Sequence, residues 1–179
     1  MKLDNNKIVW TLGHSTYSVD DFLKILKSFK IEQILDVRRH PGSLNFPQFN
    51  KKALETSLVE NKIAYIHLEI LGGRRKTHSN SKNTIWRHPS FRGYADYMET
   101  QEFEDGMKEL KNLSLKNRSA IMCSEAVWWS CHRSMISDVL KADHWKVLHI
   151  MALNKKTEHP YTKPAKIIEG KLSYDKKNN

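Results

Sequence analysis

Short apolar segments rich in β-branched residues alternate along this chain with segments whose apolar residues have helical spacing. The strand-like segments lie at residues 7–13, 33–38, 64–68, 118–123 and 146–150. Between the first two, one helical face is marked by Phe22, Ile25, Leu26 and Phe29. Strands that alternate with helices predict parallel βαβ units with right-handed crossovers. We therefore expect an α/β fold with a mostly parallel sheet of about five strands and helices on both faces.

Caps, turns and polar stretches predict the rest of the fold. Ser18, three residues before an aspartate, resembles the start of a capping box ahead of the first helix. Polar residues 77–92 predict a long loop, and the aromatic and cationic side chains within it favour an ordered binding loop. Residues 97–113 predict a helix, and residues 166–174 predict a small C-terminal hairpin. No linker or internal repeat interrupts the sequence, so residues 1–179 are predicted to form a single domain.

The charge of the chain favours an anionic partner. The formal net charge is +10, which suits nucleic acid, a nucleotide or a phosphorylated metabolite. Much of this charge is dispersed lysine, so an ordinary basic surface is the alternative. No segment approaches the roughly 18 apolar residues of a membrane span, and the first residues lack the apolar part of a signal peptide. Two cysteines are too few for a disulfide framework. We expect a cytoplasmic protein that binds no membrane, and the sequence favours no particular oligomeric state.

Both cysteines lie in residues 123–133, which join the fourth strand-like segment to an amphipathic helix. The reactive side chains of this stretch are Cys123, Glu125, Cys131, His132 and Arg133. Open α/β sheets bind ligands at the carboxyl ends of their strands. This turn is therefore the first candidate for an active site.

Cys131 is the candidate nucleophile. Its position near a helix N-terminus, beside His132 and Arg133, is of the kind that lowers the pKa of a thiol. A thiolate there could attack a substrate while His132, His14 or Glu125 manages protons. The alternative is an inert cysteine buried under the helix cap.

Cys123 and Glu125 each have two interpretations. Cys123 ends an apolar strand, so core packing explains it as well as catalysis does. Glu125 could act as a general acid or base, or as the partner of Arg133, since an arginine fork fits a carboxylate. The eight-residue separation of Cys123 from Cys131 also permits a disulfide if the loop folds back.

Other strand ends carry polar groups that could meet the thiols. His14 and Ser15 follow the first strand, and Asp36 lies near the end of the second. Asp36 could orient an arginine or make an ordinary surface pair. Of two adjacent tryptophans, one could pack on the core while the other, such as Trp129, lines the cleft and stacks on a base. The arginines that could clamp phosphate groups bidentately are Arg38, Arg39, Arg74, Arg75 and Arg92.

Metal binding is the competing chemistry. Cys123, Cys131 and His132 could supply sulfur and nitrogen ligands, with His14 or Glu125 completing a tetrahedral set for zinc or iron. The spacing is not that of a zinc finger, however, and the sequence requires no cofactor.

Several ordered motifs resemble a known family. They lie at residues 12–16 (LGHST), 36–43 (DVRRHPGS), 47–50 (PQFN), 71–76 (LGGRRK), 86–97 (WRHPSFRGYADY), 122–133 and 158–162 (EHPYT). Over nearly its whole length the chain thus resembles the bacterial and archaeal family catalogued as domain of unknown function 488 (DUF488). The resemblance implies a single cytoplasmic α/β domain and implies no particular reaction. The positions that match the family motifs are His14, Ser15, Asp36, Arg38, Arg74, Arg75, Cys123, Glu125, Cys131, His132, Arg133 and, near the C-terminus, His159.

Three functions are consistent with these features. The first is an enzyme with a Cys/His/Glu/Arg site at the strand ends that acts on a phosphorylated or nucleic-acid substrate. The second is a non-catalytic module for nucleic acid or nucleotides, which would use the basic loop at residues 72–94. The third is a metal-dependent enzyme that uses the thiols as ligands.

Overall fold

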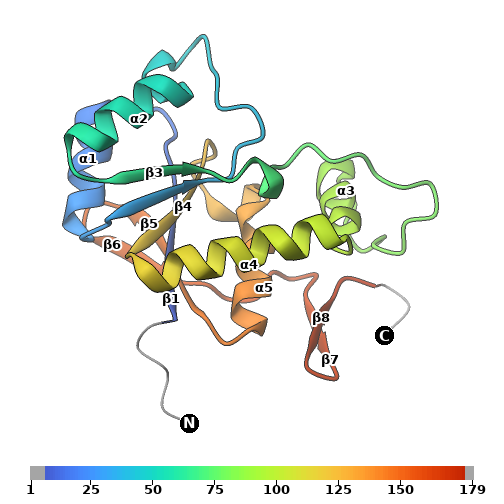
Figure 1. Ribbon diagram of the computed structural model, residues 1–179. Helices are drawn as coiled ribbons and strands as arrows, with labels where there is room; N and C mark the ends of the chain where they lie inside the picture. Colours follow the sequence, from blue (N-terminus) through green and yellow to red (C-terminus); the bar gives the residue numbers. More distant parts are fainter. Residues whose placement is uncertain (1–6, 176–179) are drawn as a thin grey trace.

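A six-stranded sheet forms the centre of the structure, in the order β3-β2-β4-β1-β5-β6 (Figure 1). The computed structural model describes residues 7–175. The strands are β1 (Ile8–Gly13), β2 (Gln33–Asp36), β3 (Ala64–His67), β4 (Ser119–Cys123), β5 (Lys146–Ala152) and β6 (Lys155–Glu158). The first five are parallel to one another, and β6 pairs antiparallel with β5. The predicted parallel sheet is therefore confirmed, with one edge strand added.

Strand β6 was missed because its sequence lacks an apolar pattern. All four of its residues are exposed, and Asn154 turns the chain into it with a φ of 58°. An edge strand needs no buried face, and lysines on an edge discourage pairing with other chains.

Helices cover both faces of the sheet (Figure 1). Helices α1 (Val19–Ser28) and α2 (Lys51–Glu60) pack on one face, and α3 (Pro89–Tyr97), α4 (Gln101–Lys116) and α5 (Arg133–Ala142) pack on the other. Successive strand side chains point to opposite faces. Thus Leu35 belongs to the core beneath α3, α4 and α5, whereas its neighbour Ile34 belongs to the core beneath α1 and α2. The structure is a single α/β domain, as predicted.

Helix α1 begins as its sequence predicts. The Oγ of Ser18 accepts a hydrogen bond from the Asp21 backbone N–H at 3.1 Å. Its predicted apolar face, which includes Phe22 and Leu26, is buried in the core.

The predicted helix over residues 97–113 is wrong in its bounds. Helix α3 already begins at Pro89 and ends at Tyr97, and α4 starts separately at Gln101. The hydroxyl of Thr100 accepts a hydrogen bond from the Phe103 N–H and so caps α4. The break between the two helices therefore follows from a cap that the apolar spacing does not reveal.

The long loop before α3 is ordered by one buried carboxylate. Asp96 accepts hydrogen bonds from the His78 backbone N–H, the Ser81 hydroxyl and the Asn83 amide. Within the loop, Trp86 stacks on Phe91 with ring centroids 5.0 Å apart. The prediction of an ordered loop is confirmed.

The predicted C-terminal hairpin is also confirmed. It consists of β7 (Lys166–Ile168) and β8 (Lys171–Ser173), which pair antiparallel. Glu169 and Gly170 form its turn with positive φ values of 48° and 78°, as a two-residue hairpin turn of type I′ requires. Among the helices of the described chain, none combines the length and the apolar character needed to cross a bilayer.

The neighbouring strands β1 and β4 position the candidate site. Helix α1 follows β1 on one face of the sheet, and α5 follows β4 on the other. Because the two connections diverge, the carboxyl ends of these strands form a topological switch point, where open α/β sheets bind their ligands.

Candidate active site

The loops after β1 and β4 are joined by backbone hydrogen bonds. The His14 N–H donates to the Cys123 carbonyl at 3.0 Å, and the Ser15 N–H donates to the Ser124 carbonyl at 2.9 Å. A Cβ atom on Gly13 would lie only 1.7 Å from the Glu125 carbonyl oxygen. The absence of a side chain at Gly13 therefore permits the two strand ends to meet.

Replacing Gly13 by alanine is expected to destabilise the protein by about 2–3 kcal/mol, because the added methyl group must displace backbone rather than a side chain. Urea denaturation measures this change. Gly42→Ala is the matched control, since the nearest atom to its added Cβ would be 4.0 Å away. Equal stability of the two variants would contradict the close approach of the loops.

Two buried thiols lie at the centre of the site. Cys123 is 6% exposed and Cys131 is 3% exposed, and both are free. Their Sγ atoms and a ring nitrogen of His132 all lie within 4.8 Å of one another. The sequence stretch that holds both cysteines thus folds back on itself.

Arg133 supplies the positive charge at the thiols. Its side chain is buried, its backbone N–H approaches Cys131 Sγ at 3.5 Å, and its Nε–H approaches the same sulfur at 3.4 Å. Its Nη2 donates to the backbone carbonyl of Glu125 at 2.5 Å. The predicted ion pair between Arg133 and the Glu125 carboxylate is wrong, because the Glu125 side chain is exposed and no ion pair joins the two in the described chain. A buried cation requires a partner. Among the residues that the structure describes, Cys131 is the ionisable group that the N–H groups of Arg133 contact.

The two thiols have opposite acidities. Burial alone would raise the pKa of Cys131, but the hydrogen bond from Cys123 and the charge of Arg133 outweigh it and lower that pKa to about 6. The hydrogen bond with Cys131, followed by burial, raises the pKa of Cys123 to about 12. These opposite pKa shifts favour the thiolate at Cys131 and the protonated thiol at Cys123.

His132 is oriented by a backbone carbonyl. Its Nε2 lies 3.0 Å from the Val37 carbonyl oxygen, and a carbonyl only accepts, so Nε2 carries the hydrogen. The other ring nitrogen, Nδ1, lies 3.7 Å from Cys131 Sγ. Gly73 borders this nitrogen, since a Cβ there would lie 3.1 Å from it. His132 Nδ1 is thus the ring nitrogen next to the Cys131 sulfur.

His14 lies at the strand ends, but its ring nitrogens are already occupied. Nδ1 bonds to the Ser15 carbonyl at 3.0 Å, and Nε2 lies 3.2 Å from Nη1 of Arg38. Burial, and then the charge of Arg38, lower the pKa of His14 to about 4. The ring is neutral at pH 7 and stacks on Phe49. This arrangement argues against the expected role of His14 as a proton carrier.

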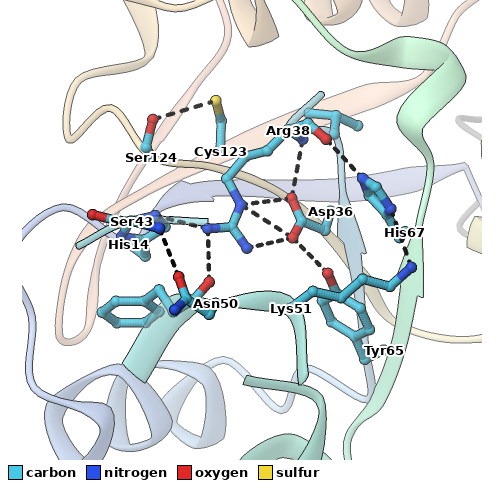
Figure 2. A network of polar contacts seen from close by, with 12 residues as sticks. His14, Asp36, Arg38, Ser43, Asn50, Lys51, Tyr65, His67, Cys123 and Ser124 are labelled. Carbon is cyan, nitrogen blue, oxygen red and sulfur yellow. Dashed lines mark hydrogen bonds and ion pairs between the residues drawn. The ribbon is translucent and has the colours of Figure 1, made fainter. Parts of the chain in front are cut away.

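Asp36 and Arg38 form a buried ion pair near Cys123 (Figure 2). Arg38 Nη2 lies 2.6 Å from Asp36 Oδ2, and the Tyr65 hydroxyl donates to the same carboxylate at 2.7 Å. Arg38 Nη1 also donates to the Phe49 carbonyl at 2.9 Å. The expectation that Asp36 orients an arginine is borne out, but Arg38 is thereby engaged within the protein.

The other candidate arginines divide into two groups. Arg75 donates to backbone carbonyls and lies over the Tyr97 ring at 3.6 Å, and Arg92 donates to the Trp86 carbonyl. Arg75 and Arg92 therefore stabilise the fold.

Arg39 and Arg74 form the second group. Arg74 is exposed, and Arg39 donates to its carbonyl at 3.3 Å. Neither Arg39 nor Arg74 forms an ion pair within the described residues, so both are available to an anion.

One of the two adjacent tryptophans packs inward, as predicted, and a stacking role for the other stays a prediction. Trp128 stacks on His149, with ring centroids 4.5 Å apart and nearly parallel planes, whereas Trp129 is 56% exposed.

His159, expected to bind an anion, is instead buried. Its Nδ1 lies 2.8 Å from His149 Nε2, and its Nε2 lies 3.0 Å from an Asp138 oxygen. His159 therefore belongs to an internal network.

The buried network around His159 extends behind the candidate site and was not predicted from the sequence. The Thr11 hydroxyl bonds to His149 Nδ1 at 2.7 Å, and His149 leads through His159 to Asp138. Burial, followed by the charges of His159 and Arg133, lowers the pKa of His149 to about 2, so this ring stays neutral. A signal did exist in the sequence: Asp138 is a carboxylate three residues after buried Met135, on the apolar face of α5.

A metal ion would find three ligand atoms at the site, from Cys123, Cys131 and His132. The distance of 3.7 Å from Cys131 Sγ to His132 Nδ1 is near the roughly 3.5 Å that zinc bond lengths require between tetrahedral ligands. The expected fourth ligands are not in this group. The donor set fits zinc with one open position.

A cavity of about 820 Å³ lies elsewhere, between α4, α5 and β8. Phe103, Val139 and Leu172 are among its lining residues, and neither cysteine borders it. The candidate chemistry therefore lies at the strand ends and not in this cavity.

Comparison with known proteins identifies a family for this chain. Neither the curated proteins nor the solved structures contain a match to this chain. Residues 18–140 match the family described as Domain of unknown function DUF488. The match spans most of the chain and includes both cysteines, His132 and Arg133. The protein belongs to the DUF488 family.

Proposed function

We propose that this protein is an enzyme whose nucleophile is the Cys131 thiolate. The observation that carries the proposal is the buried Arg133, which directs both its backbone N–H and its Nε–H at Cys131 Sγ without a carboxylate partner. The adjacent N-terminus of α5 also favours negative charge. His132 Nδ1, beside the sulfur, accepts and returns protons.

The proposed substrate is anionic, either a phosphorylated molecule or a nucleic acid. Arg39 and Arg74 form no ion pair within residues 7–175. Arg39 lies against Gly72, and Arg74 directly follows Gly73, which borders His132. The exposed Trp129 offers a surface on which a base stacks, and the net charge of +10 attracts polyanions. We also infer a cytoplasmic location, because a reducing compartment keeps both thiols free.

Two small electrophiles that differ in charge test this proposal. Iodoacetate and iodoacetamide both alkylate thiolates, but electrostatic repulsion slows iodoacetate at an ordinary thiolate. At Cys131 we expect iodoacetate to react at least as fast as iodoacetamide at neutral pH and low salt. Added salt should restore the ordinary order, because it screens exposed cations. Peptide mapping by mass spectrometry measures both rates.

Three substitutions show which residues cause the preference for iodoacetate. Cys131→Ser should lose the label, and Arg74→Gln should shift the rate ratio several-fold toward iodoacetamide. Lys155→Gln removes an equal charge from the exposed edge strand β6 and should leave the ratio unchanged. Labelling that prefers iodoacetamide in the wild type, or that falls on Cys123 instead, would refute the proposal.

A further inference from the structure

We propose that Cys123 and Cys131 are a redox pair that closes reversibly into an intramolecular disulfide when a hydroperoxide oxidises the protein. The disulfide would remove the Cys131 thiolate and switch off its chemistry. This regulatory consequence rests on the proposed function, whereas formation of the disulfide does not.

The geometry brings the two sulfurs together from opposite ends of one loop. Cys123 is the last residue of β4, and Cys131 directly precedes His132, the residue at the N-cap of α5. Both sulfurs lie within a group whose atoms are no more than 4.8 Å apart. A disulfide requires a separation of about 2.0 Å, so each sulfur must move by only an ångström or so.

The intervening loop has room to make this adjustment. Between the cysteines, Ser124, Glu125, Ala126, Trp129 and Ser130 are exposed, and none of them is part of the apolar core. The strand and the helix that flank the loop are packed on the sheet and need not move. The closure is therefore local.

Each of the two neighbouring sulfurs takes a different part in the closure. The Cys131 thiolate attacks one oxygen of the hydroperoxide, the O–O bond breaks, and the other oxygen leaves with the electron pair and takes up a proton. Cys131 becomes a sulfenic acid. Cys123 then loses its proton, for which a His132 ring nitrogen within 4.8 Å is the acceptor, and its sulfur attacks Cys131 Sγ. The S–O bond breaks and water leaves after gaining a proton.

The overall reaction is balanced. With hydrogen peroxide, two thiols and one peroxide yield one disulfide and two water molecules, and two electrons pass from sulfur to oxygen. A dithiol reductant returns the two electrons and two protons. Because both sulfurs are less than a tenth exposed, we expect small hydroperoxides to react and large protein disulfides to be excluded.

Intact-mass spectrometry of the full chain tests the inference. After an equimolar dose of hydrogen peroxide, the reduced wild type should lose about 2 Da, the mass of two hydrogens, and dithiothreitol should restore it. Non-reducing peptide mapping should then link the Cys123 and Cys131 peptides. In Cys123→Ser no disulfide can form, so the chain should gain about 16 or 32 Da as sulfenic or sulfinic acid. Cys131→Ser should stay unmodified at the same dose.

Three results would overturn the inference. They are addition of oxygen to the wild type without loss of hydrogen, a disulfide between two copies of the chain, and a co-purifying metal ion that shields both thiols in native mass spectra. Thermal melting confirms that each variant is folded, and Cys123→Ala replaces Cys123→Ser if the serine disrupts the core. Failure of the proposed function would give a different result. A protein that does not react preferentially with iodoacetate would still lose two hydrogens on oxidation.

Discussion

Ultraviolet titration of the reduced protein is expected to show one thiolate forming with a midpoint near pH 6 and a second only near pH 12. The first transition should be absent in Cys131→Ser. Against an ordinary thiol pKa of 9.0, the shift corresponds to a roughly thousandfold larger acid dissociation constant. The physical cause is that the thiol of Cys123 and the charge of Arg133 both stabilise the anion, and together they outweigh burial.

The rate of alkylation should follow the same curve, because only the thiolate is nucleophilic. Above pH 6 the Cys131 rate should be nearly constant, and below it the rate should fall about tenfold per pH unit as the sulfur is protonated. An unfolded chain, in contrast, should react fastest in alkali. Measuring the alkylation rates of the folded and the unfolded chain over the same pH range separates the effect of the fold from that of the reagent.

Two substitutions of Cys123 provide the matched control. Cys123→Ala removes the S–H donor and should raise the Cys131 midpoint by about 1–2 pH units, the equivalent of a hydrogen bond to a charged group. Cys123→Ser retains a donor and should shift the midpoint less. A wild-type midpoint near 9, or one that survives in Cys131→Ser, would contradict the assignment of the thiolate.

The sheet was predictable where side-chain patterns are strong. The apolar segments at residues 7–13 and 33–38 correspond to β1 and β2, since a strand buried on both faces must be apolar throughout. The segment at residues 64–68 corresponds to the edge strand β3, whose residues are exposed or half-buried. Strand β6 and the break between α3 and α4 escaped prediction for a different reason. They depend on an exposed edge and on the Thr100 cap, and neither leaves a periodic signal.

The location of the site was predictable, but the partners within it were not. The position of Cys131 between a strand and a helix sufficed to bring it near His132 and Arg133. The sequence suggested the wrong partner for Arg133, because an arginine that caps a backbone carbonyl has no sequence signature distinct from one that pairs with Glu125.

The same limit applies to the histidines. Whether His14 carries protons depends on what its two ring nitrogens contact, and those contacts come from Ser15 and Arg38. Arg38 is distant in sequence and is itself held by Asp36. Such long-range hydrogen bonds are set by tertiary packing, which the order of residues alone does not reveal.

Asp138→Ala is expected to lower the free energy of unfolding by about 3–5 kcal/mol, because it leaves several buried donors without an acceptor. The Asp138 side chain is fully buried and accepts from His159, from the Thr162 backbone N–H at 2.8 Å and from the Tyr174 hydroxyl at 2.7 Å. These donors lie on the chain that follows β6. The carboxylate therefore ties that segment to α5, and urea denaturation measures its contribution.

Asp143→Ala, at the C-terminal end of the same helix, is the matched control. Asp143 is exposed and pairs only with Lys111 at the surface, so its loss should cost less than about 1 kcal/mol. Hydrogen exchange separates the roles further, since Asp138→Ala should accelerate exchange in residues 159–174 more than in the central strands. Similar stabilities for the two variants would mean that the buried network is dispensable. A large loss confined to Asp138→Ala would instead show that the C-terminal segment keeps α5, and with it the N-terminal turn that holds Cys131, in place.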